Sequence, residues 1–144
     1  MGAVPEPTPV PRTVWEVDLV RGRLDERRGS LAIEADAIVF RPDAGGADRR
    51  LALADVRRVR RLFASPVLVV THGVAVVETA YYFVEPPPLR PPAETSLRPG
   101  LGSPRRKLRR QAFARLAEGN RMLREELRSW ERALREAVAE ARRD

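Results

Sequence analysis

The sequence predicts an α+β fold, in which a domain of short β-strands is followed by one long C-terminal α-helix. Residues 13–85 are rich in Val, Leu and Ile and contain stretches that alternate apolar with polar residues, which indicates half-buried strands. Residues 86–103 contain six prolines, which remove the backbone donors that a strand ladder needs. Residues 105–142 contain no proline, which favours a single helix. A chain of 144 residues has room for one such domain.

The strand-rich part is preceded by a proline-rich N-terminus, residues 1–12, which we expect to be disordered. Seven strand-like segments follow, at about 14–24, 30–35, 37–41, 49–53, 56–63, 67–71 and 74–84. Turn-forming residues separate them, namely Arg28-Gly29, Asp36, residues 42–46, residues 64–66 and His72-Gly73. Apolar residues at 56, 59 and 62 also recur at helical spacing, so residues 53–63 fit a helix as well as a strand.

The C-terminal helix is predicted over residues 104–142. Ser103 is a suitable N-cap and Pro104 suits the first helical position. At about 1.5 Å per residue this helix spans roughly 58 Å, whereas a 100-residue domain is about 30 Å across. The helix therefore either extends beyond the domain or breaks near Gly119-Asn120.

One face of this helix carries an apolar stripe, interrupted by Asn120. Its members are Leu116, Leu123, Leu127, Trp130, Leu134, Ala137 and Ala141. A coiled-coil dimer is one partner for the stripe, but in a parallel homodimer Glu126 would face Glu131 of the other chain, which disfavours pairing. Packing on the β domain of the same chain is favoured, with Trp130, Leu123, Leu127 and Leu134 as structural anchors. We expect a monomer or a weak homodimer.

Positive charge is concentrated at the start of the helix. Residues 1–85 carry 12 basic and 12 acidic side chains, whereas residues 105–124 carry eight basic side chains and one acidic one. The segment 105–124 thus accounts for a surplus of seven, equal to the net charge of the chain, +7. Cations at a helix N-terminus are disfavoured by the helix dipole, so this clustering indicates either an anionic partner or first helical turns that fray in solvent.

Little in the sequence suits catalysis, so we expect a protein that is not an enzyme and needs no metal or cofactor. There is no cysteine, and the single histidine, His72, precedes a glycine in a predicted turn. Asp25 and Glu26 are adjacent and would point to opposite faces of a strand. The glycine-containing loops lack the lysine and the strand-helix context of phosphate-binding loops.

No apolar run approaches the roughly 20 residues of a membrane-spanning helix, and the N-terminal residues do not form a secretory signal. We therefore expect a cytoplasmic protein with peripheral contact at the inner face of the membrane.

Several stretches resemble the pleckstrin-homology-like and GRAM-domain proteins common in actinobacteria. They are GRLDERRGSLAIEADAIVF (residues 22–40), LALADVRRV (51–59), AYYFVEPPPL (80–89), and the helix residues Arg109-Arg110, Leu116, Asn120, Trp130 and Leu134. The resemblance implies a seven-stranded antiparallel β-barrel or sandwich over residues 13–85, capped by the helix, and makes residues 56–63 a turn entering a strand. It also implies binding of phospholipid headgroups or proteins. The basic residues near the first hairpin are Arg21, Arg23, Arg27 and Arg28, interrupted by Asp25 and Glu26.

Three functions follow, in order of preference. The first is peripheral binding of anionic lipid, with Arg105, Arg106, Lys107, Arg109, Arg110 and Arg115 as the contact residues. The second is a protein-interaction adaptor that uses a second basic patch of Arg57, Arg58, Arg60 and Arg61, of which strand alternation places at most half on one face. The third is nucleic-acid binding by residues 105–124, which lack a recognised motif.

Overall fold

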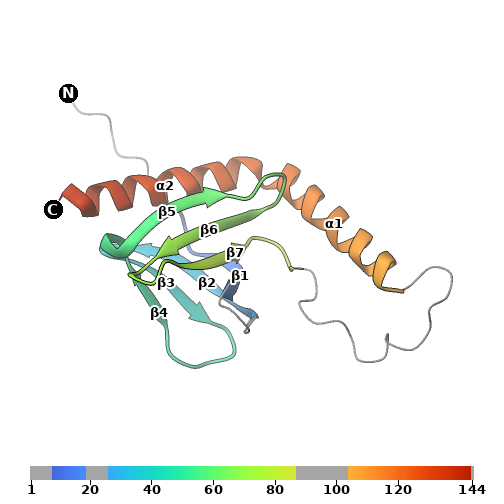
Figure 1. Ribbon diagram of the computed structural model, residues 1–144, viewed down its shortest axis with the longest axis horizontal. Coiled ribbons are helices and arrows are strands. Elements are labelled where there is room, and N and C mark those ends of the chain that lie inside the picture. Colours follow the sequence, from blue (N-terminus) through green and yellow to red (C-terminus); the bar gives the residue numbers. More distant parts are fainter. Residues whose placement is uncertain (1–7, 19–25, 87–103, 144) are drawn as a thin grey trace.

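The computed structural model describes residues 8–18, 26–86 and 104–143, without the side chains of residues 104–109 and 112. Seven strands form one antiparallel sheet in the order β4-β3-β2-β1-β7-β6-β5 (Figure 1). The strands are β1 (Arg12–Asp18), β2 (Glu26–Glu34), β3 (Ala37–Pro42), β4 (Arg49–Ala52), β5 (Val56–Arg61), β6 (Val67–His72) and β7 (Val77–Tyr82). A short 3-10 helix, η1 (Leu53–Asp55), joins β4 to β5. The predicted α+β class, with seven antiparallel strands followed by a C-terminal helix, is confirmed.

Two local predictions are settled by these boundaries. The helical alternative for residues 53–63 is wrong beyond η1, because residues 56–61 pair with β6 as a strand. The turn predicted at Arg28-Gly29 is also wrong, since Gly29 lies inside β2. A Cβ atom at this glycine would lie 2.6 Å from Cζ of Phe40 and would also clash with the carbonyl oxygen of Arg41. Glycine is therefore required by close packing across the strands and not by a turn.

The sequence predicted a β-barrel or sandwich, and the closed barrel is wrong because the sheet is open. Strands β4 and β5 are the two edges of the sheet, and no ladder joins them. The helix α2 (Arg124–Arg143) instead packs against η1 and β5. Figure 1 shows α2 lying along β5, so the helix covers this edge strand of the open sheet.

The predicted C-terminal helix is divided in two. Helix α1 (Pro104–Met122) ends three residues beyond the glycine at which a break was expected, and α2 begins at Arg124. The two helices meet at an angle, so that α1 points away from the line of α2 (Figure 1). Near the junction, a Cβ atom at Gly119 would lie 2.8 Å from Cγ1 of Val84, so α1 approaches the sheet closely there.

Apolar residues on the inner face of the sheet form one core with α2. The anchors Leu127, Trp130 and Leu134 are at most 2% exposed, and the Trp130 ring packs edge-on against Phe83 with ring centroids 5.9 Å apart. Leu116 is buried, while Leu123, Ala137 and Ala141 are partly buried. The core also contains Val138, which the predicted stripe omitted. The prediction that the helix packs on the β domain of the same chain is confirmed.

Candidate functional site: an arginine-lined groove between β5 and α2

A β-bulge sets the position of two arginines from the second predicted basic patch. In the β5–β6 ladder Val56 pairs with His72 and Arg58 pairs with Thr71, so Arg57 is an extra residue on β5. Because of this irregularity, Arg57 and Arg58 both line one groove. The expectation that Arg57 and Arg58, as neighbours on a strand, face opposite sides of the sheet is therefore wrong.

The other two members of that patch do not line the groove. Arg60 lies 3.7 Å from a carboxylate oxygen of Glu78, and Arg61 is half-buried near the end of β5. The structure thus brings together Arg57 and Arg58 only.

Helix α2 contributes two further arginines that the sequence analysis missed. Arg135 donates from Nε and Nη2 to the carbonyl oxygen of Val59, at 3.3 and 3.2 Å. Arg142 donates from Nη2 to the carbonyl oxygens of Val56, at 2.6 Å, and of Arg57, at 3.2 Å. Their spacing of seven residues places both on one face of the helix, and this was the signal that could have identified them.

The groove has a volume of about 300 Å³ and combines cationic walls with apolar side chains. Its lining consists of Arg57, Arg58, Val59, Arg135, Val138, Ala139 and Arg142. No acidic residue is among them, although Glu131 lies 3.4 Å from Nη1 of Arg135. Arg58 is exposed and has no acidic partner within the described part of the chain. Apart from Arg135, the groove arginines therefore have no acidic partner among the residues that the structure describes.

The contacts of α2 also protect the free edge of β5. An uncovered edge strand presents unpaired backbone groups to which another chain can add a strand. We expect the double variant Arg135→Ala/Arg142→Ala to self-associate, because three carbonyl groups of β5 lose their donors. Sedimentation velocity measured over a range of concentrations checks this. The control is Arg128→Ala/Arg132→Ala, which removes the same charge from exposed positions of α2 and should stay in the wild-type state.

The first predicted patch lies elsewhere. Arg105, Arg106, Lys107 and Arg109 belong to α1, but their side chains are outside the described residues. Arg110 and Arg115 are exposed on α1. Helix α1 joins the N-terminal end of α2, whereas Arg135 and Arg142 lie on its C-terminal half (Figure 1). The two predicted patches therefore do not form one site.

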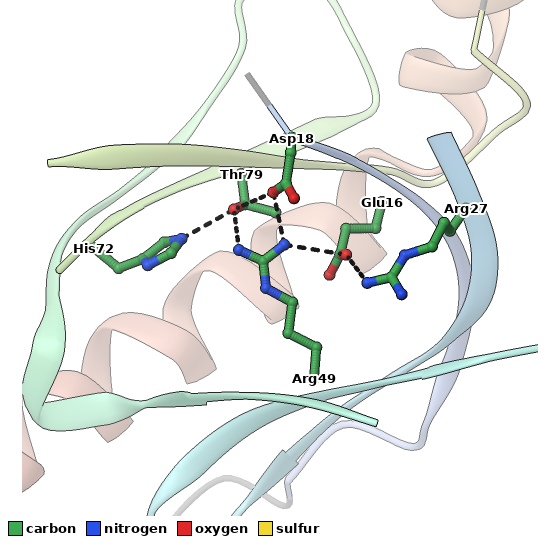
Figure 2. A network of polar contacts seen from close by, with 6 residues as sticks. All are labelled: Glu16, Asp18, Arg27, Arg49, His72 and Thr79. Carbon is green, nitrogen blue, oxygen red and sulfur yellow. Dashed lines mark hydrogen bonds and ion pairs between the residues drawn. The ribbon is translucent and has the colours of Figure 1, made fainter. Parts of the chain in front are cut away.

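A second cluster of arginines lies on the inner face of the sheet, where acidic side chains neutralise their charges (Figure 2). Nη1 of Arg49 lies 3.2 Å from Oε1 of Glu16 and 2.6 Å from Oδ1 of Asp18. The same Glu16 oxygen accepts a hydrogen bond from Nη2 of Arg27 at 2.8 Å. Glu16 is 2% exposed, so this carboxylate requires both arginines as partners.

Neutral side chains complete this cluster. Thr79 donates to Oδ1 of Asp18 at 3.0 Å, and Nε2 of His72 lies 2.9 Å from the Thr79 hydroxyl (Figure 2). Burial and the nearby charge of Arg49 lower the pKa of His72, which favours the neutral ring. Burial and the charge of Glu16 raise the pKa of Tyr81 well above its usual value.

The arginines of the first hairpin that the structure describes are therefore already paired. Arg27 contacts Glu16, and Arg28 lies 3.6 Å from Asp43. Arg21 and Arg23, together with Asp25, are outside the described residues. In the β5–α2 groove four arginines line one site, and among the described residues only Arg135 of the four has an acidic partner, which makes this groove the candidate site.

The described ranges include no group of three or more His, Cys, Asp or Glu side chains placed to hold a metal ion. Neither described helix is long and apolar enough to cross a membrane. Comparison of the sequence with protein-family models and with curated proteins gives no match.

Proposed function

We propose that this chain is a non-enzymatic binding module of the pleckstrin-homology-like class, which docks on anionic phospholipid headgroups. The resemblance noted in the sequence and the arrangement of an antiparallel sheet with a C-terminal helix support the class. The observation that carries the proposed function is the β5–α2 groove, where four arginines meet without a lining acid.

The chemistry of arginine suits this ligand. A guanidinium group presents several N–H donors in one plane and binds phosphate oxygens with two parallel hydrogen bonds. In the groove, Arg135 and Arg142 are already held by the backbone of β5, so ordering them for a ligand costs little conformational entropy. Arg57 is similarly held through its Nε, which donates to the carbonyl oxygen of Gly73 at 2.9 Å.

Long-range electrostatics supports the same ligand. The chain carries a net charge of +7, and Arg110 and Arg115 on α1 add exposed positive charge outside the groove. Each basic side chain near an anionic membrane contributes about 1 kcal/mol to binding, and this contribution weakens as salt is added. A scaffold with such a charge distribution needs no catalytic group to act as a membrane adaptor.

The test compares two double variants in vesicle co-sedimentation at low salt. Arg57→Gln/Arg58→Gln removes two groove charges, and we expect affinity for mixed phosphatidylcholine and phosphatidylserine vesicles to fall by roughly tenfold or more. The matched control is Arg41→Gln/Arg50→Gln, which removes the same charge from exposed arginines that Glu34 already compensates. The control should bind almost as well as the wild type.

Two results would contradict the proposal. One is equal and weak binding of the wild-type protein to anionic vesicles and to pure phosphatidylcholine vesicles. The other is an equal loss of affinity in both double variants, which would mean that total charge matters and that the groove does not.

A further inference from the structure

Phe63 is the most exposed large apolar side chain in the described part of the chain. It lies in the turn between β5 and β6 and is 97% exposed. The turn is closed by two backbone hydrogen bonds, from Leu62 N to Val67 O at 3.0 Å and from Ser65 N to Leu62 O at 3.3 Å. Ala64 has a φ of 56°, a left-handed conformation that is uncommon for residues with a side chain. A defined turn therefore holds the Phe63 ring in solvent.

Other exposed apolar side chains belong to the segment that touches this turn. A Cβ atom at Gly119 would lie 3.3 Å from Cγ of Pro66, so the last turns of α1 contact the end of the β5–β6 connection. Figure 1 shows this connection beside the junction of α1 and α2. Met122, the last residue of α1, is 77% exposed, and Phe113 is 66% exposed. Large apolar side chains are thus exposed on two segments that adjoin each other.

The same end of the molecule carries uncompensated positive charge. Arg121 and Arg124 are exposed and flank Met122, while Arg61 precedes the turn. None of the three has an ion-pair partner among the residues that the structure describes. Aromatic and long apolar side chains surrounded by arginines are typical of segments that lie in the interface of an anionic membrane. This combination of charge and exposed ring identifies the occupant as an anionic bilayer.

We infer that the β5–β6 turn inserts the Phe63 ring into the interfacial layer of the membrane, with Met122 beside it. This inference rests on the proposed function and adds the orientation of docking. Val59 lines the groove, and Phe63 lies four residues further along the chain. Four residues of an extended strand span roughly 13 Å. One membrane surface can therefore contact both, with the groove arginines at the headgroups and the ring below them.

The affinity test compares two equally exposed apolar residues in two turns. Phe63→Ser should weaken binding to mixed phosphatidylcholine and phosphatidylserine vesicles by roughly tenfold, because serine lacks the apolar ring that is transferred from water into the membrane. The control is Val74→Ser, which changes a 94% exposed residue in the turn at the other end of β6. This turn adjoins the groove through Arg57, whose Nε donates to Gly73, yet the Val74 variant should bind like the wild type.

A spectroscopic test reports the position of the ring directly. Tryptophan replaces Phe63 in one variant and Val74 in the other, and the signal of the two native tryptophans is subtracted with the wild-type protein. With anionic vesicles, Phe63→Trp should shift its emission to shorter wavelength and be quenched by brominated lipid. Val74→Trp should do neither.

The outcomes separate the inference from the proposed function. If the wild-type protein binds anionic vesicles and Phe63→Ser binds equally well, the inserting turn is refuted while the groove stands. If the Val74 variants and not the Phe63 variants lose vesicle affinity and show quenching by brominated lipid, the inferred orientation of the protein on the membrane is wrong. If the wild-type protein ignores anionic vesicles, the proposed function and the inference fail together.

Discussion

Replacement of Trp130 by alanine is expected to remove about 3–5 kcal/mol from the free energy of unfolding. The indole is 2% exposed, lies on α2 and packs edge-on against Phe83, so its loss leaves a cavity between helix and sheet. Since small domains are stable by only about 5–15 kcal/mol, this one change removes a large share of the total. Urea unfolding followed by far-ultraviolet circular dichroism measures the difference.

The second tryptophan provides the control for this prediction. Trp15 is half-buried, and its ring faces the guanidinium of Arg28 at 5.7 Å. Trp15→Ala should cost much less, about 1 kcal/mol, because solvent already reaches the ring. Similar losses for both tryptophan variants would show that α2 is not an integral part of the core.

Replacement of Arg49 by alanine is expected to cost about 2–4 kcal/mol of stability. The variant leaves Glu16, which is 2% exposed, with one arginine in place of two, and it removes the ion pair of Asp18. Its cost lies toward the lower part of the range for buried pairs because the Arg49 side chain is 23% exposed. Thermal or urea unfolding at neutral pH measures it.

The adjacent residue in the same strand is a matched control. Arg50 pairs with Glu34 at 2.9 Å and with Asp36 at 3.1 Å, but Arg50 and Asp36 are exposed and Glu34 is only half-buried. Arg50→Ala should therefore change stability by no more than about 1 kcal/mol. Adding Glu16→Gln to Arg49→Ala should recover part of the loss, because the buried side chain at position 16, which keeps only Arg27 as a partner, is then neutral. Absence of any recovery would mean that packing, and not electrostatics, accounts for the role of Arg49.

Much of the fold could be predicted because local patterns determine it. The apolar run at residues 67–71 and turn residues such as Gly73 located the strands, and the stripe through Trp130 identified the buried side of the helix. Closure of the sheet was predicted wrongly because no local pattern reports it. The sheet stays open, and α2 packs along its edge strand β5 through bonds from Arg135 and Arg142 to backbone carbonyl groups.

The candidate site could be predicted only in part. Arg57 and Arg58 were identified as basic residues, but the bulge that places both in one groove depends on the ladder with β6. The inner cluster was missed, although Glu16 and Asp18 occupy the same strand face as the buried Val14, where polar residues need partners. Arg49 comes from a distant strand, so only the register of the sheet could reveal the pairing.

The place of α2 in the chain has a consequence for biosynthesis. Its hydrogen bonds to β5 join residues 76 and 86 positions apart, so the element that covers the sheet leaves the ribosome after all seven strands. Until then the nascent sheet has two bare edges and an uncovered apolar face, both of which favour aggregation. Completion of folding therefore waits until α2 has been synthesised, and slow synthesis of residues 104–143 would lengthen the interval in which a chaperone can capture the chain.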